Sequence, residues 1–556
     1  MLDNPARKYP AAHIIDYPQR TWPAKRLQAP PRWCSTDLRD GNQALANPMD
    51  AQRKLTFFKH LIACGFKEIE VAFPAASEVD FAFVRLLIEE NHIPEDVTIQ
   101  VMTPARSDLI ERTIVSLNGA SKAIVHVYNA TAPIFREMVF QKDKAELIAL
   151  ATAAAKQVRQ LCEQSPQTDW TLQYSPETFC FTEADFALEI CEAVAQVWEP
   201  EPKRPLILNL PTTVEINTPN VFADQVEHFM RSFSDLKNIT ISVHPHNDRG
   251  TGAATAEMAM LAGAQRVEGC LFGNGERTGN VDLVTLAMNL YTQGVHPQLQ
   301  FANIRQTVEI VEQCNQLPVH PRHPYGGSLV FTAFSGSHQD AIKKGFAHRA
   351  RLGREAWHIP YLPLDPQDVG CSYEEVIRVN SQSGKSGAAW LLQENHGLRL
   401  PRALQVDFSQ HVQQQTEQTG TEISQAQVWQ LFRSLYGVLE NRPLSLLHYT
   451  SEPRGAEQYV TATLRYGEET LSLQGQGCGL LSALSDGVQK AFDCVLNIMD
   501  YQEHTLGPQS SSNAISYIQI ASPSSAITHF GVAIETDASK AALQALLNAV
   551  ADLIRE

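Results

Sequence analysis

From Arg32 to Gly273 the hydrophobic positions form short apolar, β-branched runs, separated by longer stretches in which apolar positions recur at helical spacing. This alternation is typical of repeated strand–helix units. Eight runs predict strands, near Trp33–Leu38, Glu68–Phe73, Thr98–Thr103, Lys122–Tyr128, Trp170–Ser175, Leu206–Leu210, Ile239–Val243 and Arg266–Phe272. Eight such units within about 250 residues predict an α/β fold, a TIM-type (β/α)8 barrel.

The pattern changes after the barrel. The strand–helix rhythm breaks near Pro324, and the stretch from about Pro401 to Glu440 has helical periodicity. From about Asn441, two rounds of strand-like runs each precede an amphipathic stretch, which predicts a small pseudo-duplicated α+β domain. The first round ends in the amphipathic stretch Ser482–Met499 and the second in Ser539–Arg555. We expect a catalytic barrel with an N-terminal extension over residues 1–325, a mainly helical linker region over 326–440 and the α+β domain over 441–556.

Polar and reactive side chains gather where the predicted strands end. Because a barrel carries its chemistry at the carboxyl ends of its strands, these residues are expected to share one rim. Loops after strands are commonly polar, so one such cluster would mean little, but here six strands end this way. The segments are Asp37–Gln43, His126, Ser175–Glu177, Pro211–Thr213, His244–Asp248 and Gly273–Asn280.

A divalent metal site is predicted at this rim. His244 and His246 are two positions apart at a strand end, so both imidazoles project to the same side. Asp40 and Asn280 offer oxygen ligands from the same rim, and this mixed set suits Mn, Mg or Zn without choosing among them. Asp248 and Glu276 are either acceptors for ring N–H groups and metal-bound water or simply solvated loop carboxylates.

Composition narrows the class of protein. With 556 residues the chain needs several folding units, and its 44% hydrophobic and 19% charged residues describe a globular protein. No run of about 18 apolar residues is present to span a membrane, and the first 20 residues do not resemble a secretory signal, so we expect a cytoplasmic protein. The net charge of −16 argues against a nucleic-acid partner, because phosphate binding needs a basic face. A small-molecule enzyme is favoured.

Three ordered motifs, Asp37–Gln43, His244–Gly250 and Gly273–Asn280, resemble those of the long-form 2-isopropylmalate synthases. The resemblance extends from about residue 30 to the end of the chain. It implies condensation of acetyl-CoA with 2-oxoisovalerate, a homodimer, a divalent metal, activation by a monovalent cation and feedback inhibition by leucine. It assigns the metal ligands to Asp40, His244, His246 and Asn280. It also assigns site roles to Arg39, His126, Glu177, Thr213, His338 and Tyr361.

These residue types suit the implied reaction. Arg39 is always charged and can stabilise a developing alkoxide, and it is also expected to pair with Glu70 in the barrel mouth. His338 and Glu177 are the candidates for the proton transfers, without an assignment of either to one step. His126, Thr213 and Tyr361 are expected to line the substrate pocket, with Tyr361 and His338 supplied from outside the barrel.

Alternatives remain open at this point. Homocitrate and citramalate synthases share the metal motifs and differ in the pocket for the 2-oxoacid side chain. A non-catalytic, metabolite-sensing barrel would lack some of the polar groups that are present here. The turn at Ser510–Ser512 departs from the glycine- and alanine-rich turns of the resembled family, so a C-terminal domain that only stabilises the dimer is a further alternative to leucine binding.

Overall fold

The computed structural model describes residues 6, 8, 17–353, 356–373, 385–419, 422–439, 442–506, 513–523 and 527–554. The serine-rich turn at 510–512 lies outside these ranges. Within them the chain forms two compact units, 1–330 with 367–371 and 331–366 with 372–556. In the part that the structure describes, no helix is long and apolar enough to cross a membrane.

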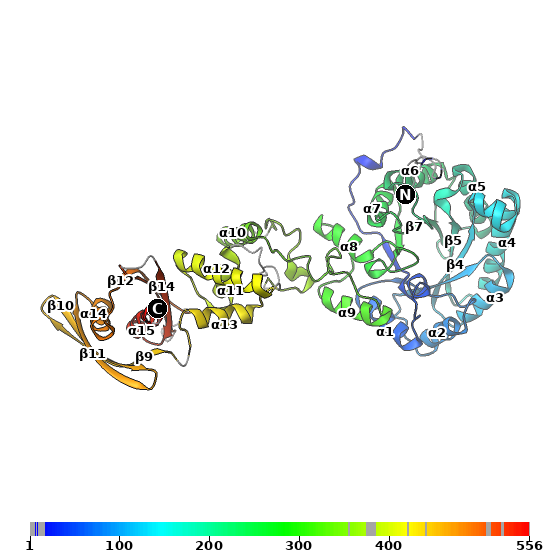
Figure 1. The fold of residues 1–556 in the computed structure, drawn as a ribbon. Coiled ribbons are helices and arrows are strands. Elements are labelled where there is room, and N and C mark those ends of the chain that lie inside the picture. The colour runs from blue at the N-terminus through cyan, green and yellow to red at the C-terminus, as the bar shows by residue number, and fades with distance from the viewer. Residues whose placement is uncertain are drawn as a thin grey trace. The chain divides into compact units, whose positions relative to one another are not determined.

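The first unit is a closed barrel of eight parallel strands in the order β1 to β8, with helices around the outside (Figure 1). The predicted TIM-type fold is therefore confirmed. The strands are β1 Arg32–Ser35, β2 Glu68–Ala72, β3 Thr98–Pro104, β4 Lys122–Ala130, β5 Asp169–Glu177, β6 Leu206–Pro211, β7 Ile239–His244 and β8 Arg266–Gly269. The helices are α1 Ala51–Ala63, α2 Glu78–Glu89, α3 Ser107–Ser116, α4 Lys144–Glu163, α5 Ala184–Trp198, α6 Pro219–Ser232, α7 Gly252–Ala262, α8 Leu283–Thr292 and α9 Ile304–Asn315.

The sequence explains how these elements form. Strands β2 and β6 are buried along their whole length, as expected for parallel strands that are covered on both faces. Asp50, Ser77 and Asp143 begin α1, α2 and α4 by accepting hydrogen bonds from the first free N–H groups of each helix.

Two predicted strand ends are wrong, and both lie at the rim that carries the reactive residues. The first strand was expected to reach Leu38, but β1 stops at Ser35 and residues Asp37–Gly41 form a single π-helical turn. The last strand was expected to reach Phe272, but β8 stops at Gly269, and Phe272 adopts a left-handed conformation with φ 56°. Tight turns with buried apolar residues look like strand continuations in a hydrophobicity pattern.

The second unit begins with helices and ends in the predicted α+β domain. The helices are α10 Gly336–Leu352, α11 Lys385–His396, α12 Arg402–Thr419 and α13 Gln425–Leu435. The α+β domain contains β9 Leu444–Arg454, β10 Glu457–Tyr466, β11 Glu469–Gly477, α14 Leu480–Phe492, β12 Asn497–Thr505, β13 Ala514–Ala521, β14 Thr528–Glu535 and α15 Ala538–Leu553. Its two antiparallel sheets, β11-β10-β9 and β12-β13-β14, share one apolar core with both helices.

This arrangement confirms the predicted pseudo-duplication and corrects its boundaries. The helix expected over Ser482–Met499 ends at Phe492, because Asp493 takes a left-handed conformation with φ 49°. Strand β12 follows it. The sequence analysis missed β9 and β12 as strands, since most of their residues are at least partly exposed and give no clean alternation of apolar and polar positions.

Candidate metal centre and active site

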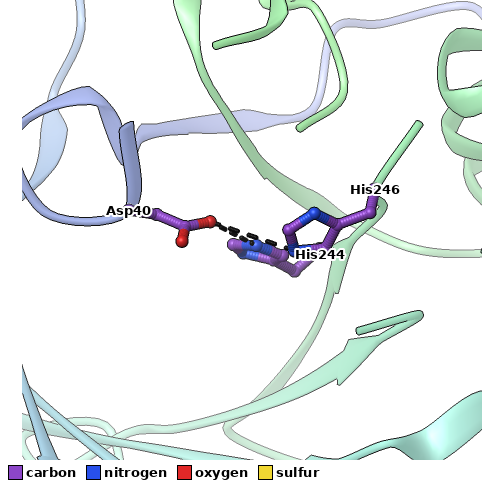
Figure 2. Close-up of side chains that lie close together, drawn as sticks. All are labelled: Asp40, His244 and His246. Atoms are coloured by element: carbon purple, nitrogen blue, oxygen red, sulfur yellow. Dashed lines mark hydrogen bonds and ion pairs between the residues drawn. The ribbon is translucent and has the colours of Figure 1, made fainter. Parts of the chain in front are cut away.

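Asp40, His244 and His246 lie together at the carboxyl end of the barrel, with the carboxylate directed at both rings (Figure 2). The Asp40 Oδ2 atom is 3.2 Å from His244 Nε2 and 4.0 Å from His246 Nε2. One potential ligand atom from each of the three buried residues falls within 4.8 Å of the others. His244 is the last residue of β7, so the spacing of the two histidines places both rings on the rim.

The π-helical turn after β1 places Asp40. The backbone N–H groups of Arg39, Asp40 and Gly41 all donate to the carbonyl of Thr36, at 3.2, 2.9 and 3.1 Å. The Arg39 guanidinium lies 3.1 Å from the Asp40 carboxylate and also pairs with Glu70. Burial raises the pKa of Asp40, but the charge of Arg39 and the hydrogen bond from His244 outweigh it and hold that pKa well below its usual value. Asp40 is thus an ionised carboxylate, the form that a cation ligand requires.

The two imidazoles have different surroundings. His244 Nδ1 lies 2.9 Å from the carboxylate of Glu268. Burial lowers the pKa of His244, but the hydrogen bonds to Asp40 and Glu268 raise it to about 9. Burial and the neighbouring His244 lower the pKa of His246 to about 4, so that ring is neutral at pH 7. A divalent cation held by these imidazoles would take the place of a proton on His244, because metal binding and protonation compete for the same ring nitrogen.

Asn280 adds an amide oxygen beside this group. A backbone bridge pairs Asn280 with His246, and the amide nitrogen of Asn280 donates to the Asn274 carbonyl at 3.0 Å. That bond leaves Oδ1 as the free end of the amide. Among the described residues, buried Asn280 Oδ1 and His246 Nδ1 have no hydrogen-bond partner. A buried acceptor is rarely left without a partner, so the oxygen of Asn280 fits a cation ligand.

Glycines close the turn that holds Asn280. Gly279 has φ 98°, and a Cβ atom there would lie 1.8 Å from the carbonyl oxygen of Gly273. Gly275 has φ 151°, and a Cβ atom there would lie 2.2 Å from the amide nitrogen of Asn280. A side chain at either position would clash with these atoms, so only glycine fits there. The two glycines thus allow the Gly273–Asn280 turn to fold closely around the Asn280 side chain.

The donor set fits a divalent cation. One carboxylate oxygen, two imidazole nitrogens and one amide oxygen suit Mg, Mn or Zn and leave room for substrate or water. A second group of ligand types, Glu70, His126 and Glu268, lies deeper in the barrel. There the amide of Gln100 sits between the two carboxylates and donates to Glu70 at 2.6 Å and to Glu268 at 3.0 Å. Gln100 therefore occupies the place a second ion would need.

A cavity of about 250 Å³ opens beside the metal ligands. It brings together most of the barrel residues predicted for the site with polar and apolar side chains for which no individual site role was predicted. The predicted residues that line it are Arg39, Asp40, His126, Glu177, Thr213, His244, His246 and Glu276. The added ones include Phe73, Met102, Tyr128, Ser175, Asn209 and Pro211.

His126 is fixed at both ring nitrogens. Its Nδ1 lies 2.6 Å from Glu70, and its Nε2 lies 2.7 Å from the Ser175 hydroxyl. The amide of Asn209 donates to the same hydroxyl at 3.0 Å. The sequence analysis gave Ser175 and Asn209 no role of their own, because serine and asparagine in a barrel strand carry no signal without their partners.

Glu177 faces the cavity from the end of β5. Burial raises its pKa, and the charges of Arg39 and His126 offset this only in part. A carboxylate with a raised pKa is a stronger proton acceptor than one in water. Thr213, at the end of β6, adopts φ 60°, and its hydroxyl accepts a 2.8 Å hydrogen bond from the backbone of Thr178.

Asp248 and Glu276 contact other residues of the rim loops. Asp248 binds Arg277 at 2.6 and 3.1 Å and accepts from the backbone N–H of Glu215. Glu276 accepts from Gln43 at 3.3 Å. In the described part of the chain neither makes a hydrogen bond to a histidine ring, whereas Glu268 does. Glu268 was missed because it lies inside a strand, where a single carboxylate looks like an ordinary interruption of an apolar run.

The remaining two predicted residues lie in the second unit. His338 is in the first turn of α10, and its ring stacks on that of Tyr361 with centroids 3.9 Å apart and planes inclined by 22°. Tyr361 is 60% exposed and adopts φ 63°. These two residues, predicted for the site one by one, are therefore neighbours, and both are exposed.

Comparisons with known proteins cover the whole chain. A family model described as HMGL-like matches residues 30–311, one described as the alpha-isopropylmalate synthase post-catalytic domain matches 328–393, and one described as the LeuA allosteric (dimerisation) domain matches 422–554. A 2-isopropylmalate synthase of a Marinomonas species is 68% identical over 100% of both chains. A 2-isopropylmalate synthase of Pseudomonas syringae pv. tomato is 52% identical over 99% of this chain and 98% of the relative.

Proposed function

Because this chain belongs to the family of the 2-isopropylmalate synthases, acyl-transferring enzymes of leucine biosynthesis, we propose that it condenses acetyl-CoA with 2-oxoisovalerate and water to give 2-isopropylmalate and CoA. One observation carries the proposal beyond the family. A single cavity joins three of the four proposed cation ligands, Asp40, His244 and His246, to an arginine and to a carboxylate of raised pKa. These are the groups that a condensation onto a keto carbon requires.

Asp40, His244, His246 and Asn280 are the residues proposed to hold the divalent cation on which this family depends. Their support is the tight cluster of the first three and the unpartnered Asn280 oxygen. When bound, a divalent cation polarises the keto group of a 2-oxoacid as a Lewis acid. Whether the cation is Mn, Mg or Zn, and whether a monovalent cation activates the enzyme, remain predictions from the donor set and the resemblance.

Arg39 and His126 are proposed to orient the 2-oxoacid. Glu70 holds both, since it pairs with the Arg39 guanidinium and lies 2.6 Å from His126 Nδ1. Arg39 keeps further N–H donors for an oxyanion that develops on the substrate, where a fixed donor is worth more than a mobile one. Thr213 is proposed to complete the polar side of the pocket.

Glu177 and His338 are the proposed proton carriers. The reaction needs a base for the acetyl methyl group and, later, activation of the water that cleaves the thioester. Burial raises the pKa of Glu177 above that of a carboxylate in water and so makes it a stronger base. His338 reaches solvent together with Tyr361, and we propose that this stacked pair covers an active site, as a lid supplied by the partner subunit of a homodimer.

The C-terminal unit is proposed to regulate the enzyme. The match of residues 422–554 to an allosteric dimerisation domain supports leucine as the effector and the homodimer as the assembly. We further propose that residues 1–325 carry out catalysis, that residues 326–440 form the linker region with the lid, and that residues 441–556 regulate the enzyme.

The substrate assignment is tested by measuring thiol release from acetyl-CoA with 2-oxoisovalerate, pyruvate and 2-oxoglutarate in parallel. We expect 2-oxoisovalerate to have the highest kcat/KM. A clear preference for pyruvate or 2-oxoglutarate would instead identify a citramalate or homocitrate synthase.

A further inference from the structure

Glu268 lies at the centre of the barrel and accepts hydrogen bonds from five side chains. Its Oε1 atom accepts from Gln100, Gln173 and Arg266 at 3.0, 2.8 and 2.8 Å. Its Oε2 atom lies 2.9 Å from His244 Nδ1 and accepts from the Asn209 amide at 3.1 Å. These donors come from β3, β5, β6, β7 and β8. Glu268 was not among the residues predicted from the sequence, and it has no part in the reaction proposed above.

This carboxylate is buried and surrounded by donors. Glu268 is fully buried at 0% exposure, and the Arg266 guanidinium and the amides of Gln100, Gln173 and Asn209 all donate to its oxygens. An ionised carboxylate only accepts hydrogen bonds. Its partner His244 must therefore carry a proton on Nδ1.

We propose that Glu268 is a positioning residue for the metal centre. It fixes the ring of His244 so that only Nε2 has a lone pair free to bind the cation. The proposal rests on the metal site proposed above. The neutral imidazole has one N–H and one free nitrogen, and the acceptor on one side decides which nitrogen can be a ligand. Carboxylates in this position orient ligating histidines and raise their basicity.

The arrangement around Glu268 makes Glu268→Gln an informative change. A glutamine must turn its single oxygen either toward Arg266, Gln100 and Gln173 or toward His244 and Asn209. Three donors, one of them a cation, favour the first orientation. The NH₂ group then faces His244 Nδ1, which must become the acceptor, and the ring proton moves to Nε2, where it blocks the ligand position.

Glu68→Gln is the matched control. Glu68 is also a buried carboxylate that pairs with Arg266, but its other partner is Arg32 and it makes no hydrogen bond to His244 among the described residues. Both substitutions take a carboxylate from the same arginine. Only Glu268→Gln changes the acceptor of the histidine.

The experiment titrates Mn²⁺ into metal-free full-length protein by calorimetry, for the wild type and both variants, with Tm measured before metal is added. We expect Glu268→Gln to weaken Mn²⁺ binding by about 10- to 100-fold, the usual effect of losing such a partner, and Glu68→Gln to change it less than about threefold at a similar loss of Tm. Equal metal affinity in the two variants would refute the positioning role.

A measurement on the wild type covers the case in which Glu268→Gln does not fold. In protein labelled with ¹⁵N-histidine and loaded with Zn²⁺, His244 should show a protonated Nδ1 and a metal-bound Nε2. Metal bound through Nδ1 would overturn the proposal. Failure of the wild type to bind either ion would instead count against the proposed metal site, so the two ideas fail separately.

Discussion

At the scale of single residues, the proposed metal centre is marked by a buried polar atom without a hydrogen-bond partner. Asn280 donates through its amide nitrogen but has a buried oxygen without a partner among the described residues. Leaving a buried polar atom unsatisfied costs about 1–3 kcal/mol. A divalent cation held by Asp40, His246 and the Asn280 oxygen would remove that cost. The residues therefore act as a set.

We predict that His246→Ala and Asp40→Ala each lose bound divalent metal and activity together while the barrel stays folded. Loss of a ligand should weaken metal binding by more than the roughly 10- to 100-fold expected for a supporting residue. Metal content after dialysis, turnover and circular dichroism measure the three quantities. His228→Ala, which removes a histidine from the outer helix α6, is the control and should keep its metal. Full metal occupancy in Asp40→Ala and His246→Ala would exclude the proposed ligand set.

His338→Ala is predicted to lower kcat by about 100- to 10,000-fold while metal and 2-oxoacid binding change little, because a proton carrier acts mainly in the transition state. Steady-state kinetics and calorimetry with 2-oxoisovalerate separate the two effects. His348→Ala removes another exposed histidine from the same helix, α10, and should leave kcat near the wild-type value. If both variants turn over equally fast, His338 has only a structural role.

At the scale of elements, three short turns after β1, β7 and β8 build the centre. The π-helical turn presents Asp40, the end of β7 presents both histidines, and the glycine-rich turn after β8 presents Asn280. Backbone hydrogen bonds tie the last two turns together, from Asn247 to Gly279 at 3.0 Å and from Val281 to Pro245 at 2.8 Å. Backbone geometry in these turns thus decides ligand geometry.

Gly279→Ala is accordingly predicted to weaken metal binding by at least about tenfold, because its Cβ atom would lie 1.8 Å from the Gly273 carbonyl and force the turn to open. The control is Gly294→Ala, at φ 83° with nothing within 4 Å of the new Cβ atom. It should cost only the roughly 1–2 kcal/mol of left-handed backbone strain and leave the metal Kd unchanged. Metal titration and thermal unfolding of both variants provide the comparison. Unaltered metal affinity in Gly279→Ala would mean that the turn does not position Asn280.

At the scale of the whole molecule, the C-terminal α+β domain and the barrel are separate folding regions of one enzyme. The domain has its own apolar core, shared by two three-stranded sheets and two helices. Any influence of leucine on catalysis must therefore pass through an element with two arrangements. The linker region that carries the His338–Tyr361 pair is the proposed element.

We predict that leucine inhibits by lowering turnover while 2-oxoacid affinity stays nearly constant, and that removal of residues from about Asn441 onward abolishes the response. Kinetics with and without leucine, on the full chain and on the shortened one, test this directly. Calorimetry on the full chain measures binding itself. No binding at millimolar leucine would leave assembly as the role of this domain.

The sequence alone was sufficient for the eight-stranded barrel, because each strand–helix unit is a local pattern and the strands are short runs rich in apolar, β-branched residues. It was also sufficient to nominate the rim residues, since chemistry in this fold follows strand ends. The ends of β1 and β8 were misjudged because the buried turns that follow them share the hydrophobicity pattern of a strand. Strands β9 and β12 were missed because they are largely exposed and lack that pattern.

Only the tertiary structure revealed the groups that hold the reactive side chains in place. Asp40 meets His244 across 204 positions of sequence, and Gln100 meets Glu268 across 168. A strand's sequence shows that a polar residue points inward, but its partner comes from whichever strand closes the barrel opposite it. Barrel closure, and not any sequence motif, therefore decides that Glu268 is the hydrogen-bond acceptor of His244. For the same reason, Ser175 and Asn209 line one cavity with the residues of the motifs.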